Sequence, residues 1–391
     1  MIQLEKALTL AGEHPIRLGT ALVPLEEAIG RVLAEDIYSD QDVPPFPRAT
    51  MDGYACRQED LPGPLMVLES IPAGKIPSRR VGKGHCSKIM TGAMVPEGAN
   101  CVIMQEYVNA EEDGRIIFTA RKTNTNIDPR AQDLKEGDLL LQRGTMLTPG
   151  HLGIISSTGK TQVKVAKSLV IGILATGSEL IEPERNPTGA QIRNSNSHQL
   201  AGQVRLAGHI PKYLGIVEDH RETLADRISG AMEQLTMLIL TGGASVGELD
   251  HVPGVLKELG FHLEYNRVAI QPGKPVSFAH RNGRICFGLS GNPVSSFVQF
   301  ELLVRPYLEI CTGAIPVNRR IRICLEKGYR RKRADRQFFL PVSFTDKGTC
   351  EPVEYHGSGH LHALDRAIGF AEIPSGQTEL RKGDKVNVRL I

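Results

Sequence analysis

From residue 168 onward, apolar runs and amphipathic stretches alternate along the chain. The run SLVIGILATG (168–177) has the pattern of a buried strand, and SNSHQLAGQVRLAG (195–208) has the spacing of an amphipathic helix. The order of strand, loop and helix recurs twice more, with MLILTGG (237–243) as the last of these strands. Strands and helices at this spacing form βαβ units, so the pattern predicts a mostly parallel sheet with helices on both faces over 168–313.

The N-terminal segment has a helical pattern that prolines bring to an end. Residues 1–36 have apolar positions spaced for two short helices, the second of them in PLEEAIGRVLAEDI (24–37). The following stretch, DVPPFPRATMDGYA (42–55), contains three crowded prolines, which exclude a helix. The segment therefore predicts a small helical framework.

Two regions are punctuated by glycine and proline and predict short strands. The first covers residues 60–145. It includes CVIMQEYVNAEEDGRIIFTA (101–120), which predicts a hairpin because two apolar runs flank the turn Asp113-Gly114. The second region begins after Gly313 and continues to Ile391, about the size of a small barrel or sandwich.

Composition excludes several classes of protein. With 391 residues the chain is too long for one core, so two to four domains are expected. The net charge of +2 and the absence of tryptophan do not indicate a nucleic-acid or membrane partner. The seven cysteines form no CxxC pair, which disfavours a zinc ribbon or a disulfide framework and favours a reducing cytoplasm. Neither a signal peptide nor an apolar run of the ~18 residues that a membrane helix needs is evident.

Three polar loops follow predicted strands of the parallel sheet, where ligands bind in such folds. They contain Glu179, Asp219 and Asp250, and the last loop, TGGASVGELD (241–250), is rich in glycine. Glycine lets backbone N–H groups approach a phosphate, and carboxylates beside a phosphate require a cation such as Mg²⁺ between them. Taken individually, Asp219 could instead simply cap a helix, and Asp250 could be an acid in the first turn of a helix that is favoured by the helix dipole.

Further stretches carry candidate binding groups together with simpler interpretations. Lys274 lies in the turn PGKP and could face an anion or only solvent. GLSGNP (288–293) begins a long predicted helix at Asn292, and a helix N-terminus can bind an anion or need only a cap. The turns around Asp52 and Thr91 have the same two interpretations.

Two other motifs favour structural interpretations. The basic run RRIRICLEKGYRRKRADRQ (319–337) is typical of a solvated strand edge, with an anion or nucleic-acid surface as the alternative. The loop HGSGHLH (356–362) has three histidines, which could bind a metal but are more often incidental to a glycine-rich loop.

Taken in order, the motifs resemble those of the MoeA family, the molybdopterin molybdenumtransferases, whose eukaryotic relatives include the gephyrin E domain. The resemblance covers residues 4 to about 388 and rests on PPFPRATMDGYA, MTGAMVPEGANCVIMQE, ATGSEL, RNSNSHQL, TGGASVGELD, PGKP, GLSGNPVS and GSGHL. It implies an enzyme that inserts molybdate into adenylylated molybdopterin, releases AMP and requires Mg²⁺.

The resemblance also implies an architecture and an assembly. The family forms cytoplasmic homodimers, and each subunit has four domains. Their expected boundaries are 1–43 plus 141–167 for a helical N-terminal framework, 44–140 for an inserted β-rich domain, 168–313 for a central three-layer α/β molybdopterin-binding domain and 314–391 for a small C-terminal β-barrel. The active site is expected between the central domain of one subunit and the inserted domain of the other. Partner proteins implied are molybdopterin adenylyltransferase and molybdoenzyme maturation proteins, with no nucleic acid and no membrane.

Site residues follow from the family motifs, position by position. Asp219 and Asp250 would hold Mg²⁺ with Glu179 in support, and Asp52 and Thr91 would approach from the other subunit as further catalytic residues. The cofactor-binding set is Thr241, Gly242, Gly243, Ser245, Arg267, Lys274, Pro275, Asn292, Arg336 and Ser358. Within this set, Lys274, Arg336 and Ser358 would bind the molybdate oxyanion.

The sequence departs from the family pattern near the expected oxyanion pocket. Pro47, Arg48 and Ala49 stand where the family usually has Asp-Asn-Ser, Ser290 replaces a usual proline, and Gln271 replaces a frequent basic residue. RQFFLP also lacks the arginine often found two residues after the position of Phe338. These departures leave the acidic residues and Lys274 in place. Because the departures alter the expected oxyanion pocket, the choice between molybdate and tungstate stays open.

Two alternatives to the transferase remain at this point. A nucleotide pyrophosphatase or adenylyltransferase on the same central domain would share the ATGSEL and TGG loops. It would lack the combination of MDGYA, PGKP and the C-terminal GSG motif that this chain has. A non-catalytic molybdopterin-binding scaffold would be expected to lose the acids, which are all present.

Overall fold

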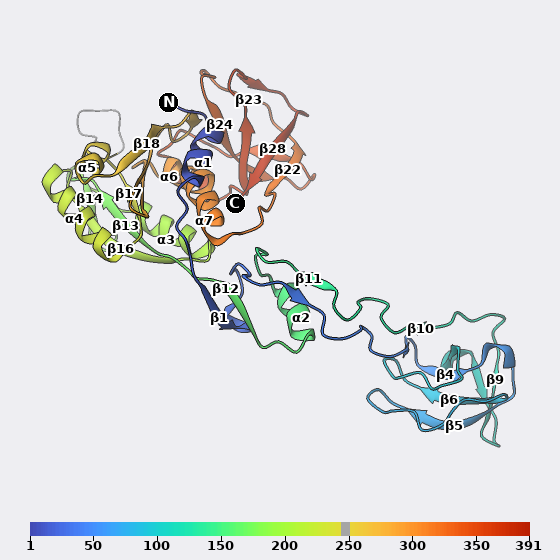
Figure 1. Cartoon of the computed structure of the whole chain (residues 1–391). Coiled ribbons are helices and arrows are strands. Elements are labelled where there is room, and N and C mark those ends of the chain that lie inside the picture. The colour runs from blue at the N-terminus through green and yellow to red at the C-terminus, as the bar shows by residue number, and fades with distance from the viewer. Residues whose placement is uncertain (244–250) are drawn as a thin grey trace. The chain divides into compact units, whose positions relative to one another are not determined.

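The computed structural model describes residues 1–243 and 251–391 (Figure 1). Within it the chain forms two compact units. Unit 1 comprises residues 1–35, 143–149 and 162–391, and unit 2 comprises 36–142 and 150–161. Each unit is described by itself.

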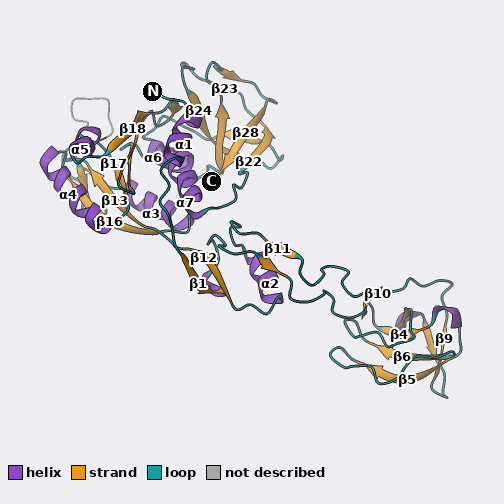
Figure 2. Ribbon diagram, viewed as in Figure 1, coloured by secondary structure: helices purple, strands orange, loops and turns teal. Residues whose placement is uncertain are grey.

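A six-stranded sheet forms the centre of unit 1 (Figure 2). Its strand order is β16 (Ile210–Val217), β13 (Val170–Thr176), β17 (Met237–Thr241), β21 (Arg284–Leu289), β20 (Pro275–Arg281) and β18 (His262–Arg267). The first four strands are mutually parallel, and β20 is antiparallel to both of its neighbours, β21 and β18. The mostly parallel sheet predicted for this segment is therefore present, and β20 and β21 form a hairpin within it.

Helices cover both faces of this sheet, which explains why its inner strands β13 and β17 are apolar almost throughout. The face that carries Ile171 packs against α1, α3, α6 and α7. The face that carries Leu240 packs against α4 and α5. The helices are α1 (Leu4–Gly12), α3 (Asn196–Leu206), α4 (Arg221–Gln234), α5 (Val252–Glu258), α6 (Pro293–Gln299) and α7 (Arg305–Thr312).

The long helix predicted after Asn292 is continuous but changes its winding. A π-helical stretch, η4 (Phe300–Val304), joins α6 to α7. Pro306 lies in the first turn of α7. Because proline has no N–H and its ring clashes with the preceding turn, a wider turn at this position relieves the conflict.

The second helix predicted over 24–37 is wrong. Pro24 ends a strand, β1 (Thr20–Pro24), which pairs with β12 (Gln162–Ala166), and only a short 3₁₀ turn, η1 (Leu25–Glu27), follows. Gly30 has a φ of +72°, which an α-helix does not accommodate. Burial of the segment by strand pairing outweighs its weak helical preference.

The C-terminal part of unit 1 is an antiparallel sheet around its own apolar core. Its order is β19 (Ile270–Gln271), β24 (Gln337–Phe344), β26 (Gly369–Ile373), β28 (Lys385–Leu390) and β22 (Arg320–Cys324), with β25 (Cys350–Pro352) also on β24. A parallel bridge between Leu325 and Cys350 links the chain after β22 to β25. The short β19 is parallel to β24, so this sheet begins beside the PGKP turn of the central domain. Smaller elements of unit 1 are β14 (Leu180–Ile181), β15 (Ile192–Arg193), β23 (Tyr329–Arg330), β27 (Glu379–Leu380) and η5 (Leu361–Leu364).

Unit 2 contains a second six-stranded sheet. Its order is β7 (Cys101–Met104), β4 (Gly53–Cys56), β6 (His85–Ile89), β5 (Leu65–Ile71), β9 (Arg115–Phe118) and β8 (Val108–Ala110). Shorter elements are β2 (Ile37–Tyr38), β3 (Arg48–Ala49), β10 (Ile127–Asp128), β11 (Leu139–Leu141), η2 (Gln58–Asp60) and η3 (Gln105–Tyr107), and α2 (Pro149–Ser157) follows β11.

The hairpin predicted around Asp113-Gly114 forms with a different partner strand. β9 pairs with the short β8, whereas the apolar run of β7 pairs with β4 on the opposite side of the sheet. The first three residues of β7 are buried because they pack in the two apolar clusters that contain Ile103 and Val102.

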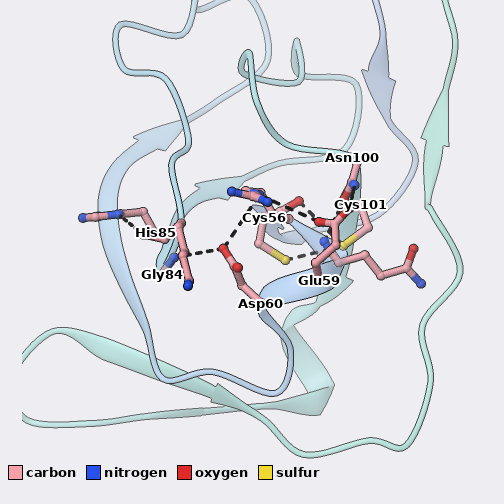
Figure 3. Close-up of polar contacts among 10 residues, drawn as sticks. Cys56, Glu59, Asp60, Gly84, His85, Asn100 and Cys101 are labelled. Atoms are coloured by element: carbon pink, nitrogen blue, oxygen red, sulfur yellow. Dashed lines mark hydrogen bonds and ion pairs between the residues drawn. The ribbon is translucent and has the colours of Figure 1, made fainter.

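Side chains fasten the loops of unit 2 to this sheet (Figure 3). Asp60 Oδ2 accepts a hydrogen bond of 2.9 Å from the backbone N–H of Gly84. The thiols of Cys56 and Cys101 face each other across β4 and β7 with their sulfurs 3.5 Å apart. These contacts hold together strands that are distant in sequence.

No helix in the part of the chain that the structure describes has both the length and the apolar character needed to cross a bilayer.

Candidate functional site

A cavity of about 1090 Å³ opens in unit 1 at the carboxyl ends of the parallel strands. Its wall comes from the loops after β13, β16, β17 and β21, from β15 and the start of α3, and from the C-terminal loop that contains Gly359. The carboxyl ends of parallel strands meet at one edge, so segments far apart in sequence are brought to one place.

Seven residues expected from the sequence lie in this wall. They are Glu179, Asp219, Thr241, Gly242, Gly243, Pro275 and Asn292. Ser245 and Asp250 lie outside the described residues. Arg267, Lys274, Arg336 and Ser358 do not line the cavity. Asp52 and Thr91 belong to unit 2.

Asp219 lies at the carboxyl ends of the adjacent strands β13 and β16. The hydroxyl of Thr176, the last residue of β13, donates a short hydrogen bond to Asp219 Oδ1. The backbone N–H of Asp219 donates to the Ser178 hydroxyl at 3.3 Å. These contacts leave the second carboxylate oxygen of Asp219 available to a ligand.

Glu179 and Asp219 offer oxygen atoms of the kind that Mg²⁺ prefers. Both line the cavity, and Glu179 follows β13 while Asp219 follows the neighbouring β16. Mg²⁺ commonly takes only one or two protein carboxylates and completes its octahedron with phosphate and water oxygens. The donor set therefore fits Mg²⁺ bound together with a phosphorylated ligand.

Glycine is required where the loop after β17 crosses the end of β13. Gly242 has a φ of +99°, and a Cβ at this position would lie 2.0 Å from the carbonyl oxygen of Thr176. On its other side, a Cβ at Gly291 would lie 3.4 Å from Gly242 Cα. Three backbone segments thus meet at van der Waals distance and expose main chain, rather than side chains, to the cavity.

Asn196 is a site residue that was not predicted from the sequence. It is the first residue of α3, is buried, and lines the cavity. Its Nδ2 donates to Thr241 Oγ1 at 2.9 Å and to the carbonyl oxygen of Gly291 at 2.8 Å. It therefore joins the loops after β17 and β21. The only sequence signal is the cluster of Asn and Ser in RNSNSHQL, which is typical of a helix start as well as of a site.

Gln299 is a second such residue and lies behind the wall. It is fully buried at the end of α6. Its Oε1 accepts from the Ser290 N–H at 2.8 Å, and its Nε2 donates to the carbonyl oxygens of Gly273 and Pro275 at 2.8 and 2.7 Å. One amide thereby fixes both the GLSGNP loop and the turn that carries Lys274. Nothing in the apolar periodicity of α6 distinguishes this glutamine.

The expected oxyanion residues lie on segments tied to the same loops. Arg336 Nη1 donates to the carbonyl oxygen of Ile270 at 3.2 Å, just before the PGKP turn. The carbonyl oxygen of Ser358 accepts from the Val294 N–H at 3.1 Å, at the start of α6. The Oε1 of Gln271 is buried without a hydrogen-bond partner in the described structure. The structure thus links these residues to the loops of the cavity without placing their side chains in its wall.

In unit 2, Asp52 and Thr91 form a local pair. Asp52 Oδ1 accepts hydrogen bonds of 2.7 Å from both the backbone N–H and the hydroxyl of Thr91. The backbone hydrogen bond, followed by the hydroxyl, lowers the pKa of Asp52 below its ordinary value of 3.8. Asp52 is therefore an anion at neutral pH, with Oδ2 free of these two bonds.

Comparison with known families covers most of the chain. Residues 2–159 match the model of the MoeA N-terminal region (domain I and II). Residues 172–310 match the "Probable molybdopterin binding domain", and residues 327–391 match the MoeA C-terminal region (domain IV). The cavity lies mainly in the second of these segments.

Individual proteins are similar along their full length. A Bacillus subtilis protein named molybdopterin molybdenumtransferase is 34% identical, and the alignment covers 95% of this chain and 90% of that protein. A Staphylococcus aureus protein of the same name is 32% identical over 94% of this chain and 90% of its own length. The crystal structure of the molybdopterin biosynthesis MoeA protein from Pyrococcus horikoshii OT3 is 31% identical with a TM-score of 0.84, covering 100% of both chains. The chain belongs to the MoeA family, as its motifs predict.

Proposed function

We propose that this protein is a molybdopterin molybdenumtransferase, which inserts molybdate into adenylylated molybdopterin and releases AMP in molybdenum cofactor biosynthesis. The observation that carries the proposal is the cavity at the carboxyl edge of the sheet, lined by two carboxylates and by glycine main chain. Full-length similarity to proteins named for this activity supports the same assignment.

The residues of the cavity suit a substrate that has a pterin, a phosphoanhydride and a nucleotide. The volume of about 1090 Å³ accommodates a ligand larger than a mononucleotide. Gly242, Gly243 and Gly291 present main chain, which can approach phosphate oxygens closely. Thr241 and Asn196 add hydroxyl and amide groups that orient a bound ligand.

We further propose that Glu179 and Asp219 hold Mg²⁺, with Asp250 as a third ligand. A bound Mg²⁺ offsets the charge that develops on the departing AMP. Thr176 orients the Asp219 carboxylate, because its hydroxyl occupies Oδ1. Lys274, Arg336 and Ser358 are proposed to bind molybdate, with Arg267 as a nearby cation, and the departures at Gln271 and Ser290 lie on the same segments.

Release of AMP from adenylylated molybdopterin tests the assignment. We expect release that depends on both Mg²⁺ and molybdate, and a decrease of at least about a hundredfold in Asp219→Asn, because metal stabilisation of charge is worth several kcal/mol. Asp346→Asn, a change at an exposed turn, serves as the matched control and should keep wild-type activity. Release without molybdate would indicate a pyrophosphatase. Binding of the substrate with no release under any condition would indicate a scaffold and overturn the assignment.

We also propose that the protein is a cytoplasmic homodimer in which Asp52 and Thr91 of one subunit complete the active site of the other. Mixing subunits tests this arrangement, because a mixed dimer of Asp52→Asn and Asp219→Asn would have one site with both changes and one with neither. Random mixing would then restore about a quarter of wild-type activity. If each site were built from one subunit, mixing would restore nothing.

A further inference from the structure

Outside the cavity, three histidines of unit 1 converge on one carboxylate oxygen. Glu264 Oε1 lies 3.3 Å from His14 Nε2, 3.1 Å from His280 Nε2 and 3.5 Å from His262 Nε2. None of these four residues lines the cavity. In the part of the chain that the structure describes, His14, Glu264 and His280 form the one group of three whose metal-ligand atoms all lie within 4.8 Å of one another.

The fold brings these side chains together from three elements. His14 follows α1, His262 and Glu264 lie on the edge strand β18, and His280 lies on β20 directly opposite His262. The pairing of β18 with β20 shifts between Leu263 and Tyr265, at the position of Glu264. Such an irregularity redirects a side chain, and here it leaves Glu264 on the same side as the two paired histidines.

A hydrogen bond from α7 fixes the backbone of His14. Tyr307, fully buried on α7, donates a hydrogen bond of 3.0 Å to the carbonyl oxygen of His14. The rings of His14 and His280 stack with centroids 3.6 Å apart. The side chains of His14, Glu264 and His280 are each at least two-thirds buried, whereas His262 is exposed. The fold therefore holds these side chains in place, and the cluster is open to solvent at His262.

Hydrogen bonding alone does not account for this convergence. One carboxylate oxygen has about two lone pairs, so it accepts about two good hydrogen bonds rather than three. By contrast, four ligands about 2.0–2.1 Å from a tetrahedral ion are separated from one another by roughly 3.3 Å. The three separations of 3.1, 3.3 and 3.5 Å from Glu264 Oε1 agree with that spacing.

We propose that His14, Glu264 and His280 bind a divalent transition-metal ion of the Zn²⁺ class, and that the exposed His262, which lies outside the group whose ligand atoms are all within 4.8 Å of one another, would rotate in as the fourth ligand. Imidazole nitrogens with a single carboxylate suit Zn²⁺ rather than Mg²⁺, which prefers oxygen ligands. In the structure the rings of His14 and His280 are stacked, and on binding they would turn about their Cβ–Cγ bonds to direct lone pairs at the ion. The site goes beyond the proposed function, since it lies apart from the cavity and uses none of its residues.

The ion would act as a clamp between the N-terminal helix and the sheet. It would join the end of α1 to β18, an edge strand that pairs with no other strand on its free side within residues 1–243 and 251–391, where only Ile2 bonds to its last residue, Arg267. Four protein ligands are typical of a structural rather than a catalytic zinc site, because they leave no open coordination position. Binding to the native state alone would raise the temperature of unfolding.

Metal titration of the full-length protein tests the proposal. After removal of metal with a chelator, Zn²⁺ is titrated by calorimetry, and Co²⁺ is added separately as a spectroscopic probe of coordination geometry. The variants are His14→Gln, Glu264→Gln and His280→Ala. The matched controls are His85→Ala, a half-buried histidine on β6 of unit 2, and His356→Ala, a histidine with Glu354 2.9 Å away that stacks on His360. Circular dichroism of the metal-free proteins shows whether each variant retains its fold.

We expect the wild type and both controls to bind one Zn²⁺ with the same Kd and to give the intense visible absorption of tetrahedral Co²⁺. Each cluster variant should weaken binding by at least about tenfold, because even outer-shell changes at metal sites cost 10- to 100-fold. Equal Kd in wild type and the folded cluster variants would overturn the proposal. Loss of binding only in His356→Ala, or a weak octahedral Co²⁺ spectrum, would overturn it as well. His14→Gln, at the end of a helix, keeps the test valid if His280→Ala does not fold.

Discussion

Gln299 Nε2 donates a hydrogen bond of 2.8 Å to the carbonyl oxygen of Gly273, across 26 positions of sequence. The same amide also bonds to Pro275 and accepts from Ser290, so it holds two loops of the candidate site from inside the core. The positions of Lys274 and of the GLSGNP loop thus depend on one buried side chain that does not line the cavity.

Replacing Gln299 by methionine should loosen both loops. The change leaves one buried N–H and two carbonyl groups without partners, and each such group costs about 1–3 kcal/mol. We expect the free energy of unfolding of unit 1 to fall by about 3 kcal/mol or more and the Kd for adenylylated molybdopterin to rise at least tenfold. Urea unfolding and equilibrium binding measure the two effects. Gln234→Met, at an exposed position of α4, is the control and should stay within about 0.5 kcal/mol of wild type. Equal effects of the two substitutions would contradict the role of Gln299.

Gly242→Ala should damage the site through the backbone. The new Cβ would lie 2.0 Å from the Thr176 carbonyl oxygen, at a φ of +99° that side chains rarely adopt. The loop must then move away from β13, and we expect ligand binding to be lost even where the protein still folds. Gly230→Ala is the control, because Gly230 lies in α4 with nothing within 4 Å of a new Cβ. In a helix interior, alanine should increase stability by about 0.5–1 kcal/mol. A Gly242→Ala protein that binds ligand normally would refute this account of the glycine.

Stability should fall at mildly acidic pH because of His209. Its Nδ1 accepts a hydrogen bond from the Leu169 N–H, and burial, helped by the charge of Arg31, lowers the pKa of His209 to about 4. Between the unfolded value of 6.5 and about 4, the unfolded chain binds a proton that the native state does not. Stability is therefore lost as pH falls through this window, by roughly 2.5 kcal/mol at pH 4.5.

Urea unfolding at pH 7 and pH 4.5 measures this loss. His209→Asn retains an acceptor for Leu169 but does not titrate, so its stability should change less with pH than that of the wild type. His85→Asn, at a half-buried position on β6 of unit 2, should keep the wild-type pH dependence. If His209→Asn and the wild type lose stability in parallel, the buried imidazole is not the cause.

Thr91→Val should raise the pKa of Asp52. Valine has the shape of threonine but lacks the hydroxyl that donates to Asp52 Oδ1 at 2.7 Å, while the backbone N–H remains. Since both bonds favour the ionised carboxyl, loss of one moves its pKa part of the way back toward 3.8. Carboxyl-carbon NMR titration measures the shift. Asp42, whose pKa is lowered by the backbone of Glu136 and by Arg130, is an internal reference that should not change. An unchanged pKa of Asp52 in Thr91→Val would show that the Thr91 hydroxyl does not lower that pKa.

Several elements could be read from the sequence because local patterns dictate them. The apolar runs that form β13 and β17 are buried on both faces, and such runs have few other stable arrangements. By contrast, the helix expected over 24–37 does not form, and β7 pairs away from the predicted hairpin. Both errors arise where a distant strand offers a better place for the same apolar residues.

The candidate site likewise has residues that local sequence patterns reveal and residues that only distant contacts define. Acids and glycines in loops after parallel strands are visible in sequence because the topology places all such loops at one edge. The roles of Asn196 and Gln299 could not be predicted, because each depends on hydrogen-bond partners in other segments. The partners of Asn196 are 45 and 95 positions away in sequence, and those of Gln299 are 9 and 26 positions away. The histidine cluster was likewise invisible, because His14 and His280 are separated by most of the N-terminal and central sequence.

By itself, then, the sequence determined the parallel α/β core, the loops that bear the acids and the membership of the MoeA family. Those features depend on short-range periodicity and on motifs that each lie within one segment. Only the tertiary structure decided which polar side chains meet: Asn196 with Thr241, Gln299 with Gly273, and three histidines around Glu264. The physical reason is that hydrogen bonds and metal ligation need distances correct to a few tenths of an ångström, and packing of the whole unit, rather than any local pattern, sets those distances.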